Sequence, residues 1–151
     1  MGNPLENNLC ETLTILAQWT NEIIAKGHLT GLGILEETIT NYIFYILIET
    51  ESRHSQHVYT KQFSRKQEGS ESGADWLWCI GNPGEWLPIL IQAKIVNPRT
   101  KQCHHLNYGT RHGKQGQLLV RYARTNRLLP LYCIYSLIDK DTNPFNLQLI
   151  C

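Results

Sequence analysis

The stretch GADWLWCIGNPGEWLPILIQAK, residues 73–94, decides the expected fold. Apolar residues on either side of a Gly81–Gly84 turn predict two antiparallel strands, 75–80 and 86–96, joined as a hairpin. The continuous apolar run in the second strand is typical of a strand that is covered on both faces. We therefore expect this hairpin to form the centre of a sheet.

The flanking sequence predicts three helices and two further strands, separated by a polar turn over 67–73 and a basic loop over 97–113. The order α-α-β-β-β-α-β predicts an α/β fold with a mixed sheet. The first helix is expected to be capped by Asn7 or Asn8 and to stop at Gly27. The predicted helices are 9–27, 34–51 and 114–126, and the further strands are 58–64 and 131–137.

The composition fits one soluble domain. The chain has 151 residues, of which 42% are hydrophobic and 18% charged, enough for one core of ordinary size. We expect an N-terminal helical extension over 1–32, a core over 33–138 and a tail over 139–151. No apolar run approaches the ~18 residues of a membrane helix, and no signal peptide is recognisable. Five cysteines without a C-x-x-C pair indicate a reducing compartment without a disulfide framework, so we expect a cytoplasmic protein.

Charge is divided unevenly along the chain. Residues 1–60 carry two basic residues against seven acidic ones, whereas residues 61–130 carry eleven basic residues against four acidic ones. No acidic residue occurs from Trp86 to Ile138. A basic half of this kind favours a polyanionic partner, and the alternative is an ordinary solvated basic surface.

Three polar residues of the hairpin are expected to converge. Gln92 and Lys94 lie two residues apart in one strand and therefore project from the same face. Antiparallel pairing brings Asp75, which opens the first strand, close to them, and a buried lysine needs such a partner. The carboxylate, the Gln92 amide oxygen and the Ala93 carbonyl are hard ligands that suit Mg²⁺, and Lys94 would orient a water or stabilise a phosphate. The set suits metal-assisted phosphodiester hydrolysis.

These residues carry a resemblance to a known superfamily. Gly73-Ala74-Asp75 and Gln92-Ala93-Lys94, with an acidic helix upstream, resemble the PD-(D/E)XK nucleases over residues 36–137, and a group of microbial proteins with similar motifs. The resemblance implies a restriction-endonuclease-like αβββαβ core with a central mixed four-stranded sheet, here with an extra N-terminal helix. It also implies Mg²⁺-dependent cleavage of DNA, or less often of RNA. Ala74 stands where proline is usual, and Gln92 stands where an acidic residue is usual.

The superfamily often adds a glutamate from its first core helix, and here the candidates are Glu36 and Glu37. Helical geometry places Glu36 at the flank of the apolar face and Glu37 away from it, so Glu36 is preferred. The alternative is that both carboxylates stabilise the positive end of the helix. Glu68 and Glu71 are either further metal ligands or plain turn residues.

The helix over 114–126 is expected to carry a basic stripe that follows phosphates, extended by cations of the preceding loop. Gln115 shares its apolar side with Tyr122, which is loosely similar to a glutamine and tyrosine in RecB-type nucleases, and the alternative is a plain polar residue at the start of the helix. Cys103, His104, His105 and His112 are a weaker zinc candidate, because adjacent ligands rarely complete a tetrahedral site. The candidate nucleic-acid-binding residues are Arg99, Lys101, Arg111, Lys114, Gln115, Gln117, Arg121 and Arg124.

The leading hypothesis is a Mg²⁺-dependent endonuclease that acts on DNA, with RNA as the other substrate and Mn²⁺ as the other ion. Its catalytic residues would be Asp75, Gln92, Lys94 and Glu36, and its metal ligands Asp75, Gln92 and Ala93. The alternative is an inactive module of the same fold that binds nucleic acid or a partner protein. A third hypothesis is an assembly protein that docks a second copy through 147–151, and a homodimer is also compatible with a nuclease. No membrane partner is expected.

Overall fold

A computed structural model describes residues 9–54, 58–82, 84–103, 106 and 109–137. The chain divides into two compact units. The first unit consists of residues 1–56, 95–102 and 135–151, and the second unit consists of residues 57–94 and 103–134. Among the described residues, no helix combines the length and the apolar character needed to cross a membrane.

The first unit contains the two long helices α1 (Leu9–Thr30) and α2 (Glu36–His54), which pack against each other. Trp19 of α1 stacks on Tyr42 of α2 with ring centroids 4.0 Å apart. The extra N-terminal helix and the second predicted helix are therefore both present, with shifted ends. The buried apolar side chains of these helices include Leu16, Ile24, Ile39, Ile43 and Leu47.

The predicted stop at Gly27 is wrong, because α1 continues to Thr30. The chain leaves the helix at Gly31, whose φ of 73° lies in the left-handed region that glycine adopts without strain. A Cβ atom at Gly27 would lie 2.5 Å from Ile34 Cγ1 and 2.8 Å from the Leu32 carbonyl oxygen. Gly27 therefore permits a close approach of the returning chain. The expected caps Asn7 and Asn8 lie outside the described residues.

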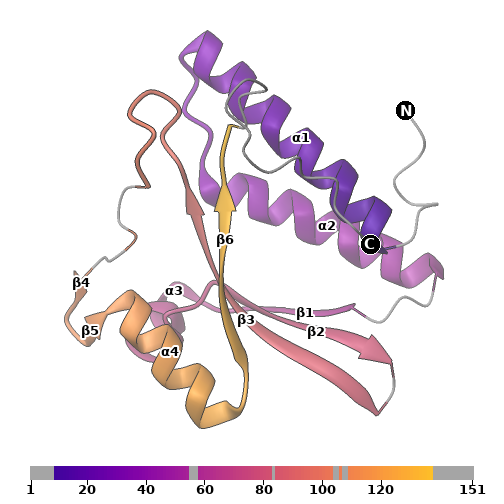
Figure 1. The fold of residues 1–151 in the computed structure, drawn as a ribbon, viewed down its shortest axis with the longest axis vertical. Helices are drawn as coiled ribbons and strands as arrows, with labels where there is room; N and C mark the ends of the chain where they lie inside the picture. Colours follow the sequence, from indigo (N-terminus) through magenta and orange to yellow (C-terminus); the bar gives the residue numbers. More distant parts are fainter. Residues whose placement is uncertain (1–8, 55–57, 83, 104–105, 107–108, 138–151) are drawn as a thin grey trace. The chain divides into compact units, whose positions relative to one another are not determined.

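The main sheet has the order β1 (Val58–Gln62), β2 (Trp76–Asn82), β3 (Glu85–Ile95) and β6 (Leu129–Tyr135). β1 pairs antiparallel with β2, and β2 pairs antiparallel with β3. β3 and β6 are neighbours that run in the same direction (Figure 1), so the sheet is mixed. The predicted α/β class with a central mixed four-stranded sheet is confirmed.

The hairpin of β2 and β3 has the register expected from its turn, with Asn82 opposite Glu85 and Trp76 opposite Ile91. Every residue from Ile89 to Lys94 is buried, as expected for a strand that is covered on both faces. β3 is the longer strand, so residues from Gln92 onward extend past the paired end of β2. This extension carries the polar residues of the candidate site.

The polar turn predicted over 67–73 is helical instead. A short helix α3 (Arg65–Gln67) leads into a π-helical turn η2 (Glu68–Ser72). Ser64 and Gln67 form a capping box, in which each side chain accepts the other residue's backbone N–H. Gly73 ends the turn with φ 63°, and its N–H donates to the Glu68 carbonyl over 3.0 Å. The serine and glycine residues of this segment favoured a turn, but the capping box starts a helix there instead. The strand predicted over 58–64 therefore ends at Gln62.

The helix α4 (Gln115–Asn126) matches its prediction within one residue. Before it, β4 (Gly109–Thr110) and β5 (Gly113–Lys114) form a two-stranded ribbon within the predicted basic loop. Leu119 and Ala123 of α4 form a buried cluster with Ala74 and Leu90, flanked by partly buried aromatic side chains. The last strand, β6, begins two residues earlier than predicted.

The cysteine prediction needs one correction. Cys79, Cys103 and Cys133 are free thiols, as expected. Cys10 of α1 is disulfide-bonded. The expectation that the chain holds no disulfide is therefore wrong at Cys10, since an odd number of widely spaced cysteines gives no information on pairing.

Candidate functional site

The backbone of Asp75 is fixed on both sides by the sheet. Its N–H donates to the Ile91 carbonyl over 2.9 Å, and its carbonyl accepts the Phe63 N–H over 2.8 Å. Asp75 thus lies one residue before β2, between Phe63, which directly follows β1, and Ile91 of β3. Its half-buried side chain is held at the point where β3 passes the end of β2.

One oxygen of the Asp75 carboxylate receives two hydrogen bonds from β3. Oδ2 accepts the Gln92 Nε2 donor over 2.7 Å and the Ala93 backbone N–H over 2.6 Å. Donors to an ionised carboxylate make short, strong hydrogen bonds. The sequence-based expectation that Asp75, Gln92 and Ala93 lie together agrees with this geometry.

The atoms that face Asp75 differ from the expectation. From the sequence, the Gln92 and Ala93 carbonyl oxygens were expected to face a shared ion. In the structure, the Gln92 amino group and the Ala93 N–H face the carboxylate instead. The physical reason is that the carboxylate can only accept hydrogen bonds, so it selects the donor end of each neighbour. The Ala93 carbonyl accepts a longer contact of 3.4 Å from Gln92 Nε2.

Gln92 leaves a polar atom without a partner. Its side chain is 0% exposed, and its Oε1 atom has no hydrogen-bond partner among the described residues. A buried carbonyl oxygen without a donor or a cation costs about 1–3 kcal/mol. Such an atom is therefore open to a ligand that can approach an oxygen lone pair.

Lys94 lies two residues further along β3, on the same face of the strand as Gln92. Its side chain is buried, with 8% exposure. We call Asp75, Gln92 and Lys94, with the Ala93 backbone, the Asp75 cluster. It places a carboxylate, an amide and an ammonium group at the end of a central hairpin.

The Asp75 cluster contains the kinds of oxygen that Mg²⁺ prefers, namely carboxylate, amide and backbone carbonyl, but it is the Gln92 amino group and the Ala93 N–H that face the carboxylate. Within the described part of the chain, no three His, Cys, Asp or Glu residues gather as a metal site. The cluster therefore contributes one carboxylate, in keeping with the way proteins hold Mg²⁺ through one or two carboxylates together with substrate phosphates. Of the zinc candidates, Cys103 and His112 form no such group, and His104 and His105 lie outside the described residues.

A second contact joins the segment before Asp75 to α4. Gln115, which is 6% exposed, donates a short hydrogen bond from Nε2 to Glu68 Oε1 in η2. A Cβ atom at Gly73 would collide with the Gln115 carbonyl oxygen and lie 2.9 Å from Leu118 Cβ. The sequence did not indicate this junction, although the glycine at the end of a helical turn is its signal. Glu71, the other glutamate considered, is exposed.

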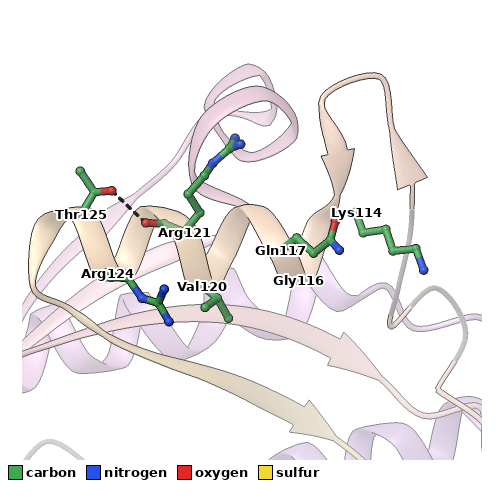
Figure 2. A pocket seen from close by; sticks show the side chains of 7 residues that line it. All are labelled: Lys114, Gly116, Gln117, Val120, Arg121, Arg124 and Thr125. Carbon is green, nitrogen blue, oxygen red and sulfur yellow. Dashed lines mark hydrogen bonds between the residues drawn. The ribbon is translucent and has the colours of Figure 1, made fainter.

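The basic stripe of α4 lies on its exposed face. Lys114, Gln117, Arg121 and Arg124 are exposed and line a hollow of about 530 Å³ (Figure 2). Gln115 is the exception among the predicted nucleic-acid contacts on this helix, because it faces η2. The remaining lining residues are Gly116, Val120 and Thr125.

The other predicted residues are distributed over both units. Arg111 is exposed in the second unit, where its Nε donates to His112 Nε2 over 2.8 Å. Arg99 and Lys101 are exposed in the segment 95–102 of the first unit. Glu36, also in the first unit, is half-buried while Glu37 is exposed, as helical geometry predicted. A catalytic role for Glu36 stays a prediction.

Residues 9–148 match a protein family described as a family of unknown function, DUF6615. The chain belongs to the DUF6615 family. The match to DUF6615 includes the whole Asp75 cluster and every residue that lines the hollow on α4. No curated protein matches the chain. Membership of DUF6615 names no activity, so the resemblance to PD-(D/E)XK nucleases stands on the two motifs alone.

Proposed function

We propose that the chain is a Mg²⁺-dependent endonuclease that hydrolyses phosphodiester bonds of DNA, with RNA as the alternative substrate and Mn²⁺ as the alternative ion. One observation carries the proposal: among the described residues the buried Gln92 Oε1 atom has no hydrogen-bond partner, while the Nε2 atom of the same amide donates to the Asp75 carboxylate. A buried oxygen acceptor and a carboxylate that is fixed by the backbone make a site that a hard cation would complete.

Each residue of the Asp75 cluster has a separate role in the proposed reaction. Asp75 would hold the ion through its carboxylate, and Gln92 would add its Oε1 atom, which has no hydrogen-bond partner among the described residues. The Ala93 carbonyl is the third oxygen donor. When bound there, Mg²⁺ supplies charge stabilisation at the phosphate and lowers the pKa of a coordinated water. Lys94 offers its ammonium group to a phosphate oxygen or to the attacking water.

Exposed cations occur in both units and suit a DNA backbone. We propose Arg111 as a phosphate contact of the second unit, and Arg99 and Lys101 as phosphate contacts of the first unit. Free thiols at Cys79, Cys103 and Cys133 support our proposal of a cytoplasmic setting, whereas the disulfide bond of Cys10 counts against it. A homodimer would allow both strands of a duplex to be cut.

The second candidate is a module that binds nucleic acid or a partner protein without cutting it. It is favoured by Gln92, which brings no negative charge to the ion, and by Asp75 Oδ2, which already accepts two hydrogen bonds. A single carboxylate binds Mg²⁺ weakly unless substrate phosphates contribute. Binding without cleavage in both Mg²⁺ and Mn²⁺ would favour this candidate.

The test is cleavage of plasmid and oligonucleotide DNA and RNA by the full chain in Mg²⁺, in Mn²⁺ and in EDTA. Asp75→Asn and Lys94→Met remove one charge each while keeping side-chain volume. Glu85→Gln and Lys66→Met remove the same charges from exposed positions of the second unit and serve as matched controls. We expect metal-dependent cleavage that is lost in the first pair and kept in the second, with circular dichroism unchanged. Cleavage that survives Asp75→Asn would refute the proposed site.

A further inference from the structure

The hollow on α4 is positively charged, and α4 has no acidic residue to neutralise this charge. Lys114, Arg121 and Arg124 are exposed, and within the described part of the chain their side chains make no ion pair or hydrogen bond. Helix cations are commonly offset by acidic residues three or four positions away. Here that is impossible, because the sequence from Trp86 to Ile138 contains no acidic residue.

The cations are spread along the hollow rather than gathered at one point. Lys114 and Arg124 are ten residues apart, or about 15 Å along the helix axis at ~1.5 Å per residue. Arg121 and Arg124 leave the helix in different directions, and Lys114 stands at its other end (Figure 2). A single compact phosphate could not reach all three cations. An extended chain of anions could, since phosphates of one DNA strand recur every ~3.4 Å along the duplex axis.

The other lining residues favour contact with a backbone rather than with bases. Gly116, Val120 and Thr125 are small, and Gln117 supplies an amide that can donate to a phosphate oxygen. Guanidinium groups bind phosphates through paired donors and remain charged at any physiological pH. Arginine and glutamine side chains can also read guanine and adenine in a groove, so a comparison of two sequences decides between backbone and base contacts.

The hollow is also rigidly tied to the segment that leads to Asp75. Gln115, the first residue of α4, donates to Glu68, and Gly73 brings the end of η2 against the same helix. Only Ala74 separates Gly73 from Asp75, and all of these residues belong to the second unit. A strand held in the hollow would therefore keep a fixed position relative to the Asp75 cluster.

We infer that the hollow on α4 binds the phosphodiester backbone of a nucleic acid strand, independently of base sequence and of metal. The inference rests on the proposed function for the nature of the ligand, and it adds where the strand lies and how it is recognised. Because the contacts are electrostatic, affinity should fall steeply as salt rises.

The experiment measures binding in EDTA by fluorescence anisotropy, so that cleavage is not required. Labelled duplex DNA, single-stranded DNA and RNA are each titrated in two unrelated sequences, between about 50 and 200 mM salt. The variant is Arg121→Gln/Arg124→Gln. The control, Lys26→Gln/Lys66→Gln, removes the same charge from exposed positions outside the hollow.

We expect equal affinity for the two sequences. On duplex DNA, the slope of the logarithm of the binding constant against the logarithm of the salt concentration should become smaller in magnitude by about 2 in the arginine variant and stay unchanged in the control. The tightest of the three ligands identifies the natural strand form. No binding by the parent chain, a strong sequence preference, or the same slope in all three proteins would overturn the inference. Salt-dependent binding without cleavage in either metal would refute the proposed nuclease activity but leave the inference about the hollow standing. Cleavage, with a salt dependence that the arginine substitutions do not change, would refute the inference about the hollow but leave the nuclease activity standing.

Discussion

Among single residues, Gln92 determines most about the candidate site. The sequence pattern was sufficient to bring Gln92 and Asp75 together and to place Lys94 on the same face of its strand as Gln92, because strand periodicity and hairpin pairing fix which residues share a face. It could not give the orientation of the Gln92 amide, which depends on the need of the Asp75 carboxylate for donors. The unpartnered Oε1 atom is a consequence of that orientation.

Replacing Gln92 by glutamate tests the cation site through stability. Gln92→Glu removes the donor to Asp75 and puts a second buried carboxylate beside it, so we expect a loss of about 1–3 kcal/mol in unfolding free energy in EDTA. Mg²⁺ should restore more stability to this variant than to the parent. Thermal unfolding with and without Mg²⁺ measures both effects. Gln102→Glu, at an exposed position, is the control, and an unchanged melting temperature of Gln92→Glu in EDTA would contradict the burial argument.

The thiol of Cys79 gives a prediction about pH. Burial raises the pKa of the Cys79 thiol above its ordinary value of 9.0. The folded state therefore keeps the thiol protonated where the unfolded chain ionises it, and stability falls as the pH rises past the unfolded pKa. Alkylation of Cys79 by iodoacetamide near pH 9.0 should be slower in the native protein than in urea, as followed by mass spectrometry. Equal rates in the two states would show that burial does not protect the thiol.

Among elements, the junction between η2 and α4 is the part that the sequence did not predict. The hairpin, α4 and its apolar face follow from hydrophobic periodicity, which needs only residues close in sequence. A π-helical turn built from serine, glycine and glutamate has no such period. Its form depends on the Ser64 capping box and on Gln115, which lies 47 residues from its partner Glu68.

Gly73→Ala should destabilise this junction strongly. Alanine at φ 63° is strained, and its Cβ would press on the backbone of α4, 2.5 Å from the Leu119 nitrogen. We expect a loss of about 2–4 kcal/mol in unfolding free energy. Gly69→Ala, in η2 with open space around it, is the matched control and should be neutral or stabilising. Urea unfolding compares the two, and equal stabilities would refute the close approach.

A buried hydrogen bond within the first unit joins the end of β6 to α2. The hydroxyl groups of Tyr135 and Thr40 lie 2.9 Å apart, and Thr40 also donates to the Glu36 carbonyl, so Tyr135 is the donor between them. Tyr135→Phe should cost about 0.5–1.5 kcal/mol. Tyr59→Phe, at an exposed position, should cost nothing measurable. Chemical denaturation that gives the same stability for both variants would contradict the assignment.

For the molecule as a whole, the charge asymmetry seen in the sequence follows the two units. The second unit carries nine basic residues against four acidic ones, and the first carries five against nine. The Asp75 cluster and the hollow on α4 both lie in the basic unit. The sequence predicted the fold class and the basic half. It could not predict that residues 95–102 join the first unit, because that grouping depends on contacts between distant segments.

The most direct measurement is a calorimetric titration of the full chain with Mn²⁺, alongside Asp75→Asn and the control Glu85→Gln. Cleavage can be missed if the wrong substrate is offered, whereas metal binding needs no choice of substrate. We predict one binding site in the parent and in Glu85→Gln, and its loss in Asp75→Asn. Binding that is unchanged in Asp75→Asn, or absent from the parent even with a phosphodiester oligonucleotide present, would contradict the assignment of the Asp75 cluster as a metal site.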